Sequence, residues 1–335
     1  MLYITLLFVA ILIILVNCRI VGGYNDEYLS PDTTKKEKGI AAILIVLHHL
    51  SQRVKVSGPF VILGYIGFIL VAVFFFISGY GLSYGVQYKH DYLKGFLRKR
   101  LLPVLVPYWI VNTVDIVFYL SGGTVFTPMQ YVLSFIGIDV ITGTWFVTAI
   151  LIMYIIFWLA FKCMKSYIVL GLCLIGYCII CINLNLHSSY TASISAFALG
   201  VCWDKIDRRM ITWIRERYYL KLTVILGAFG IMFLGRLILS AQGINNEIVH
   251  LILRNLISAL FVLALIAVNQ KVQFTGKTLE WLGNISYELY IVHYVLLSML
   301  SSLNPDVYVV AVLGGGLLLS TLLWKTDKRL IKRII

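Results

Sequence analysis

Two adjacent histidines, His48 and His49, stand inside an apolar stretch, where an ionisable side chain is costly and is therefore a candidate for function. Lys38 precedes His49 with ten residues between them, so a helix through both would place the imidazole about 16 Å from the lysine. An imidazole at that depth can take a proton from a hydroxyl as a general base. The alternative is a histidine hydrogen-bonded to a neighbouring carbonyl, but the spacing from Lys38 favours function for His49.

Three further ionisable residues fall inside apolar stretches. Asp115 and Glu288 could each orient a histidine or pair with an arginine, or each could form a protonated, hydrogen-bonded contact between helices. His293 follows Glu288 by five residues, and we expect it to be structural rather than catalytic.

Arg236 and Arg254 also fall within apolar stretches, near the ends that we predict to face outward. Their side chains could simply reach the membrane surface. The functional interpretation, which we favour, is an outward-facing site for an anionic or polyhydroxyl group, with Arg53 as a third member.

A basic cluster, Arg98 to Arg100, precedes Pro103 and Pro107 at the start of another apolar stretch. Membrane topology alone accounts for such a cluster, and on the residues alone this explanation is preferred. The functional alternative is a clamp for the phosphates of a cytoplasmic donor. Small residues in Ser78-Gly79-Tyr80-Gly81 predict close helix packing.

The sequence contains no motif that is typical of other kinds of active site. We find no glycine loop of the phosphate-cradling type, no metal-ligand spacing and no serine nucleophile elbow. Cys178 and Cys181 have the spacing of a zinc or redox pair, but without a second pair they are predicted to be small buried residues.

The composition determines the fold class. Hydrophobic residues make up 60% of the 335 residues and charged residues 13%, and Val56–Tyr88 and Ser166–Trp203 hold no charged residue. Runs of this length span a bilayer as helices. We therefore predict an all-α, polytopic transmembrane bundle. The net charge of +13 lies in short loops and indicates topology rather than nucleic-acid binding.

Eleven apolar segments are predicted to span the membrane, as a ten-span core with one additional N-terminal span. This divides the chain into residues 1–34 and a membrane domain at 35–335. The loops on one side carry 24 of the 28 Lys and Arg residues and those on the other carry two, which predicts an outer N-terminus and a cytoplasmic C-terminus. The segments are 2–18, 39–55, 59–83, 101–120, 143–161, 166–184, 190–203, 221–241, 250–269, 279–300 and 306–324.

Five stretches, in this order, resemble the acyltransferase 3 family of integral membrane O-acyltransferases. The first places Lys38 and His49 on that family's basic residue and histidine, and the fourth places Trp145 on its Trp-Phe span start. The stretches are KGIAAILIVLHHL (38–50), FFFISGYGL (74–82), FLRKRLLPVLVPYW (96–109), TWFVTAILIMY (144–154) and LGNISYELYIVH (282–293).

The resemblance implies transfer of an acyl group, most often acetyl, from cytoplasmic acyl-CoA to a hydroxyl of a cell-surface or lipid-linked glycan. His49 would be the essential histidine, as base or acyl carrier, with Lys38, Arg98 and Arg100 near the donor. Acyl-CoA would be a co-substrate, and no permanently bound cofactor or metal is implied. The expected location is the plasma membrane.

The chain departs from the family pattern at Pro103, where the family usually has an arginine, so either Arg98 or Arg100 could carry the donor contact. No extracytoplasmic hydrolase-like domain follows the core, so any polysaccharide-assembly partner would be a separate chain. Two other functions remain open: a glycan transporter or flippase, and a structural partner in a polysaccharide assembly complex.

Overall fold

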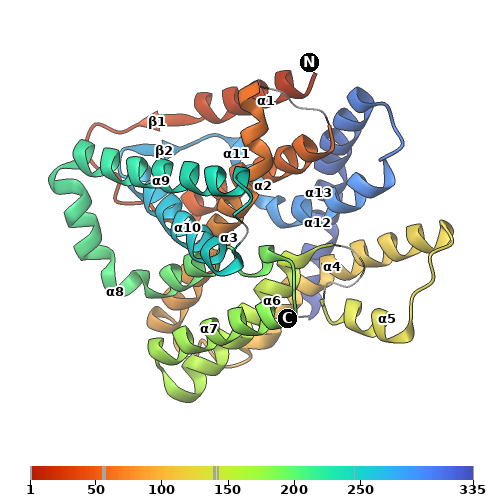
Figure 1. Ribbon diagram of the computed structural model, residues 1–335. Helices are drawn as coiled ribbons and strands as arrows, with labels where there is room; N and C mark the ends of the chain where they lie inside the picture. The colour runs from red at the N-terminus through yellow and green to blue at the C-terminus, as the bar shows by residue number, and fades with distance from the viewer. Residues whose placement is uncertain (1, 55–57, 139–140, 142, 245, 335) are drawn as a thin grey trace.

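The computed structural model describes residues 2–54, 58–138, 141, 143–244 and 246–334, and most of these residues are helical (Figure 1). The elements in chain order are α1 (Leu2–Val16), β1 (Cys18–Ile20), α2 (Pro31–Arg53), η1 (Gly58–Tyr65), α3 (Gly67–Tyr88), α4 (Phe96–Ser121), α5 (Pro128–Phe135), α6 (Trp145–Leu159), η2 (Ala160–Met164), α7 (Tyr167–Asn183), η3 (Ser188–Tyr190), α8 (Ile194–Glu216), α9 (Tyr218–Ala241), α10 (Glu247–Asn269), β2 (Val272–Phe274), α11 (Lys277–Asn284), α12 (Ser286–Met299) and α13 (Pro305–Ile334).

The all-α class is confirmed, whereas the count of eleven spans is not. Six helices of the described chain are long and apolar enough to cross a membrane: α3, α4, α6 with η2, α9, α10 and α13. Two more, α1 and α7, are apolar but shorter. The segments expected at 39–55, 190–203 and 279–300 are helical but do not meet the same criteria, because α2 and α8 carry charged residues and the last is divided.

Helices extend into regions that the apolar pattern marked as loops. α2 begins at Pro31, where the Ser30 side chain accepts a hydrogen bond from the backbone N–H of Thr33 at 3.2 Å. Because the helix begins here, Lys38 lies on α2. α2 also crosses the boundary that we predicted between residues 34 and 35. The division of the chain into two parts stays a prediction. Conversely, the expected span 59–83 is interrupted at Ile66, between η1 and α3.

A short antiparallel pair of strands was not predicted. β1 pairs with β2 in the register Cys18 to Phe274 and Ile20 to Val272. Asn17 extends the contact, since its carbonyl oxygen accepts from the N–H of Thr275 at 2.7 Å. Three-residue strands have no sequence period to detect, and they tie the segment after α1 to the segment before α11.

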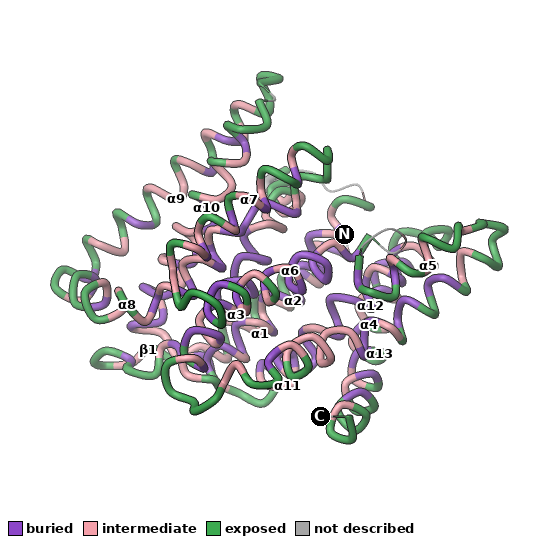
Figure 2. The backbone as a smooth tube through the Cα atoms, turned by 90° about the horizontal axis from the view of Figure 1, so that it is seen from below, coloured by how far each residue is buried: buried purple, intermediate pink, exposed green. Residues whose placement is uncertain are grey.

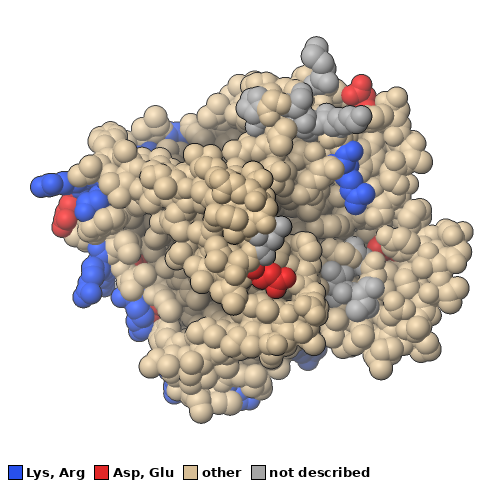
Figure 3. Space-filling model, viewed as in Figure 1, with Lys and Arg blue, Asp and Glu red and all other residues tan. Residues whose placement is uncertain are grey.

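The most buried helices are those of the centre, α2, α3 and α12, as Figure 2 shows in purple. α2 packs against α3, α11 and α12. α9 lies at the periphery and exposes large apolar side chains such as Ile231 and Leu234, as a lipid-facing helix would. Figure 3 shows Lys and Arg side chains gathered at the edge where α8 meets α9.

α3 and α8 approach each other closely through two glycines. A Cβ atom on Gly79 would collide with the carbonyl oxygen of Phe197, and one on Gly200 would collide with the carbonyl oxygen of Phe76. The small residues after Ser78 therefore allow close packing, as the sequence predicted. A Cβ on Gly81, two residues further along α3, would meet nothing within 4 Å.

We expect Gly79→Ala and Gly200→Ala each to lower the free energy of unfolding by about 1–3 kcal/mol, because each methyl group forces two backbones apart. Gly81→Ala is the matched control and should keep or raise stability, since alanine favours helix over glycine. Thermal unfolding in detergent measures all three. Equal melting temperatures for the three variants would contradict the contact.

Candidate active site

His49 lies where α2 meets α12, and two polar side chains hold its imidazole. Its Nδ1 lies 3.2 Å from Oε1 of Gln52, and its Nε2 lies 3.0 Å from the hydroxyl of Tyr294. The amide nitrogen of Gln52 donates to the carbonyl oxygen of Gly64 at 3.1 Å. One side of the ring is therefore fixed by α2 and η1, and the other side is contacted by α12.

This hydrogen-bond network determines which ring nitrogen of His49 carries the hydrogen. The carbonyl of Gly64 can only accept, so Gln52 must turn its NH₂ toward Gly64 and its oxygen toward the histidine. That oxygen accepts in turn, so Nδ1 of His49 carries the hydrogen. Nε2 is then the basic nitrogen of the neutral ring, and it accepts from the hydroxyl of Tyr294. A substrate hydroxyl in place of that phenol would meet the lone pair of a base.

A second histidine lies beside the first. The ring centroids of His293 and His49 are 5.3 Å apart, and His293 is fully buried. Its Nδ1 lies 3.0 Å from the carbonyl oxygen of Leu289, so Nδ1 donates, while Nε2 has no partner among the described residues. Tyr290 is 5.7 Å from His293 between ring centroids. We call His49, His293, Tyr290 and Tyr294 the histidine cluster. The structural role expected for His293 stays a prediction.

His48 has a different environment from its neighbour. Its Nδ1 donates to the carbonyl oxygen of Leu63 at 2.6 Å, and its Nε2 packs so tightly against Gly67 that a Cβ there would collide with it. Both sides of the imidazole are thus occupied by η1 and the first residue of α3. This is the carbonyl-bonded arrangement that the sequence offered as the alternative to catalysis.

Lys38, in the first half of α2, lies near an acidic residue, Glu288. It is half-buried and within electrostatic range of Glu288 and Arg100. Glu288 of α12 and Asp327 of α13 are both buried and lie close enough for their charges to interact. The alternatives open for Glu288 therefore stay predictions, and the cation that acts on its charge is Lys38 rather than an arginine.

Arg98 and Arg100 point to different surroundings. Arg98 is exposed and donates to the carbonyl oxygen of Ile334 at the end of α13. Arg100 is half-buried, donates to the hydroxyl of Tyr92 and lies 5.4 Å from the centroid of that ring. Of these two arginines, Arg100 lies in electrostatic range of Lys38, so Lys38 and Arg100 form a basic pair at this end of α2.

The residues expected on the acceptor side do not all lie together. Arg53 is exposed and lies in electrostatic range of His49. Trp145, half-buried at the start of α6, is 6.1 Å from Tyr190 between ring centroids. Arg236 of α9 and Arg254 of α10 lie close to each other. Both are distant from Arg53 in the sequence, and Arg53 is not among the charges that act on Arg236.

Asp115 belongs neither to the histidine cluster nor to the basic pair. It is buried in α4, and within the described ranges no hydrogen bond or ion pair joins it to a histidine or an arginine; its Oδ1 has no partner. The structure therefore does not support an orienting role for Asp115.

Three residues of these sites were missed by the sequence reasoning: Gln52, Tyr294 and Asp327. Gln52 follows His49 by three positions, a spacing that places two side chains on one helix face, and this signal was available. Tyr294 and Asp327 reach their partners only through the packing of α12 on α2 and α13, which leaves no local pattern.

Comparison with known proteins agrees with this arrangement of motifs. No curated protein and no solved structure matches the chain. The family described as an acyltransferase domain, acyltransferase 3, matches residues 38–325, from the lysine of the basic pair to the cytoplasmic end predicted for α13. That range covers most of the chain and contains His49 and the histidine cluster. The protein belongs to the acyltransferase 3 family of membrane proteins.

Proposed function

We propose that this acyltransferase transfers an acyl group, acetyl in the simplest case, from cytoplasmic acyl-CoA to a hydroxyl of a cell-surface or lipid-linked glycan. The observation that carries the proposal is the basic Nε2 of His49, oriented by Gln52 and already in contact with a hydroxyl, that of Tyr294. Acyl-CoA is a co-substrate, and no resident cofactor is required. The protein acts in the plasma membrane.

The reaction follows from the position of that nitrogen. The acceptor hydroxyl donates to Nε2 of His49 and attacks the thioester carbon, while its proton moves to the imidazole. Collapse of the tetrahedral adduct breaks the carbon–sulfur bond, and the leaving thiolate of CoA takes the proton from His49. The bond between Nδ1 and Gln52 strengthens as the imidazolium forms. Alternatively, Nε2 itself attacks the thioester carbon, the carbon–sulfur bond breaks and CoA leaves as the thiolate. The acceptor hydroxyl then attacks the acyl carbon, the bond to Nε2 breaks, and the hydroxyl proton passes to the thiolate.

The donor is proposed to enter from the basic end of α2. Lys38 and Arg100 would bind the phosphates of CoA, because both are partly buried cations within range of each other. The helical rise from Lys38 to His49 is about 16 Å. That distance lets an extended pantetheine arm bring the thioester to the histidine.

A transporter or flippase is the second candidate function, with the same residues lining a path for a glycan. A structural partner in polysaccharide assembly is the third. The held tautomer of His49 favours catalysis over both, because a transport path needs polar groups but no oriented base. Consumption of acyl-CoA by the purified protein separates the enzyme from both alternatives.

We expect His49→Ala to lower acyl transfer by at least about 10²–10⁴-fold, roughly 3–5 kcal/mol in the barrier, because the general base is lost. His48→Ala is the matched control and should keep part of the activity, since His48 is engaged by Leu63 and Gly67. Acyl incorporation into the glycan is measured with equal amounts of inserted protein. An active His49→Ala variant beside an inactive His48→Ala variant would reverse the assignment.

Gln52→Leu should lower kcat by about 10- to 100-fold with little change in KM, because one hydrogen bond to the charged imidazolium is worth about 1.5–3 kcal/mol. Gln52→Glu keeps an oxygen for Nδ1 and should recover part of kcat. Similar losses in both variants would show that Gln52 supports only the helix end and does not orient His49.

Arg100→Ala should raise the KM for acyl-CoA by about 10- to 100-fold, from the loss of one charge-assisted hydrogen bond to phosphate. Arg98→Ala should act more weakly, since Arg98 is bonded to the end of α13. The double variant should weaken donor use more than acceptor use. Lys99→Ala is the exposed control within the same cluster. An unchanged KM in the double variant would reduce the cluster to a topology signal.

The N-terminus is expected outside and the C-terminus in the cytoplasm, on the basis of the 24 Lys and Arg residues on one side against two on the other. Reporter fusions after α13 and within 121–142 should therefore report opposite sides of the membrane. Both reporters on one side would contradict the topology and the proposed entry of the donor.

A further inference from the structure

Arg236 of α9 and Arg254 of α10 are neighbouring cations without an acidic partner. They are close enough for their charges to repel. Arg236 is only 9% exposed, and its Nε and Nη1 lack acceptors, as does Nε of Arg254. In the part of the chain that the structure describes, no ion pair includes either arginine.

Such an arrangement is unfavourable without a counter-charge. Desolvating one cation without a counter-charge is costly, and a second cation nearby adds repulsion. The ring of Phe68, 5.1 Å from the guanidinium of Arg236, offsets part of this cost. Three guanidinium nitrogens, which carry four N–H bonds, still have no acceptor among the described residues. Two guanidinium groups with unused donors match the charge and the oxygen atoms of one phosphate group.

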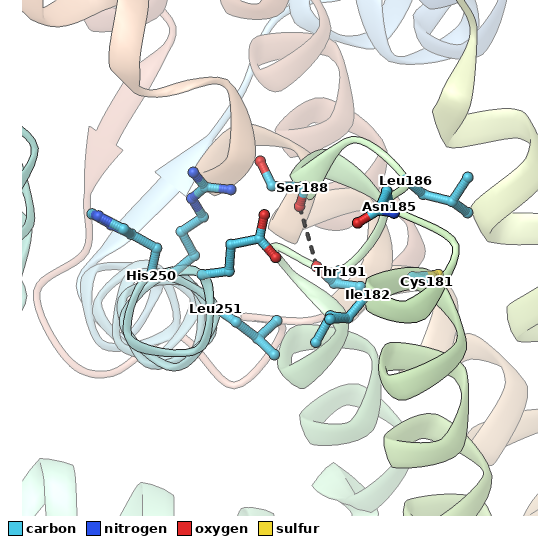
Figure 4. Close-up of a pocket in the computed structure, with 10 residues that line it drawn as sticks. Cys181, Ile182, Asn185, Leu186, Ser188, Thr191, His250 and Leu251 are labelled. Atoms are coloured by element: carbon cyan, nitrogen blue, oxygen red, sulfur yellow. Dashed lines mark hydrogen bonds between the residues drawn. The ribbon is translucent and has the colours of Figure 1, made fainter. Parts of the chain in front are cut away.

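A cavity of about 290 Å³ opens beside Arg254. Figure 4 shows the loop that carries Ser188 and Thr191 on one side of it and α10 with His250 on the other. Nδ1 of His250 is buried without a partner, while its Nε2 lies 2.7 Å from the carbonyl oxygen of Ile244. Glu247 also lines the cavity, but its side chain is exposed and makes no ion pair with Arg254.

Two series of side-chain contacts run toward the histidines, one from Arg236 and one from the cavity wall. Phe68, beneath Arg236, follows Gly67, against which His48 is packed. On the other side Tyr190, the neighbour of Thr191, contacts Trp145 at 6.1 Å between ring centroids. Trp145 leads through Phe146 to Tyr290 of the histidine cluster, at 6.2 and 5.1 Å between successive centroids. The arginines and the histidines are therefore bordered by the same set of contacting aromatic side chains.

We propose that Arg236 and Arg254 bind a phosphate group of the acceptor, so that the acceptor is a phosphorylated or diphosphate-linked saccharide. The inference rests on the proposed function, because it assigns the ligand to the acceptor. The phosphate supplies the counter-charge that the arginines lack. Its binding holds the sugar so that a hydroxyl can reach the histidine cluster.

The direct test uses the full-length protein in a maltoside detergent, which carries no phosphate, with inorganic pyrophosphate as the probe. Pyrophosphate should raise the melting temperature in a saturable way. Arg254→Gln and Arg236→Gln should each weaken its apparent affinity at least about tenfold. Arg208→Gln, an exposed arginine of α8, is the matched control and should bind as the wild type does. Without pyrophosphate the first two variants should melt higher than the wild type, because an uncompensated charge is removed.

Two results would overturn the proposal. One is equal pyrophosphate binding by the wild type and the Arg254→Gln variant, or no binding at all. The other is stabilisation of the wild type by added phosphatidylglycerol but not by pyrophosphate, which would identify a site for membrane lipid. Either result leaves acyl-CoA consumption intact. Failure of the proposed function would instead appear as acyl transfer that survives His49→Ala while pyrophosphate binding is normal.

Discussion

The hydrogen bonds that run from the carbonyl of Gly64 through Gln52 to His49 are the interaction on which the site depends. A carbonyl can only accept, so it fixes the orientation of the amide, and the amide fixes the hydrogen on Nδ1. The basic nitrogen is thereby aimed at α12, where Tyr294 meets it. The position of η1 against the end of α2 thus decides the chemistry available at Nε2.

α2 carries a cationic side chain, Lys38, in its first half and a neutral base, His49, near its end. Its first half holds Lys38 in electrostatic range of Arg100 and of the buried Glu288. Its last turns hold the imidazole of His49 between Gln52 and Tyr294. A reaction that joins an anionic donor to a hydroxyl needs charge at the first place and an uncharged base at the second. α2 can place both groups, because the rise per residue of a helix fixes the distance between Lys38 and His49.

Buried charge is treated in two opposite ways in this protein. At Glu288 and Asp327 two buried carboxyl groups lie close to each other on α12 and α13, with the cation of Lys38 in range of Glu288. At Arg236 and Arg254 the charges have neither a carboxylate nor a full set of acceptors among the described residues. In a medium of low dielectric the first pair has an opposite charge nearby, whereas the second is costly without a counter-charge.

The sequence by itself determined the helical membrane class and the positions of most apolar helices, because hydrophobic length is a local property. The choice of His49 over His48 stays a prediction, which rests on the spacing from Lys38 and on the family resemblance. The sequence did not determine the number of spans, since α2 and α8 mix charged and apolar residues and Ile285 divides the segment 279–300. Only the tertiary structure brought Tyr294 to His49, Asp327 to Glu288 and Arg236 to Arg254. These pairs lie on different helices, and their approach is decided by packing contacts that no local period encodes.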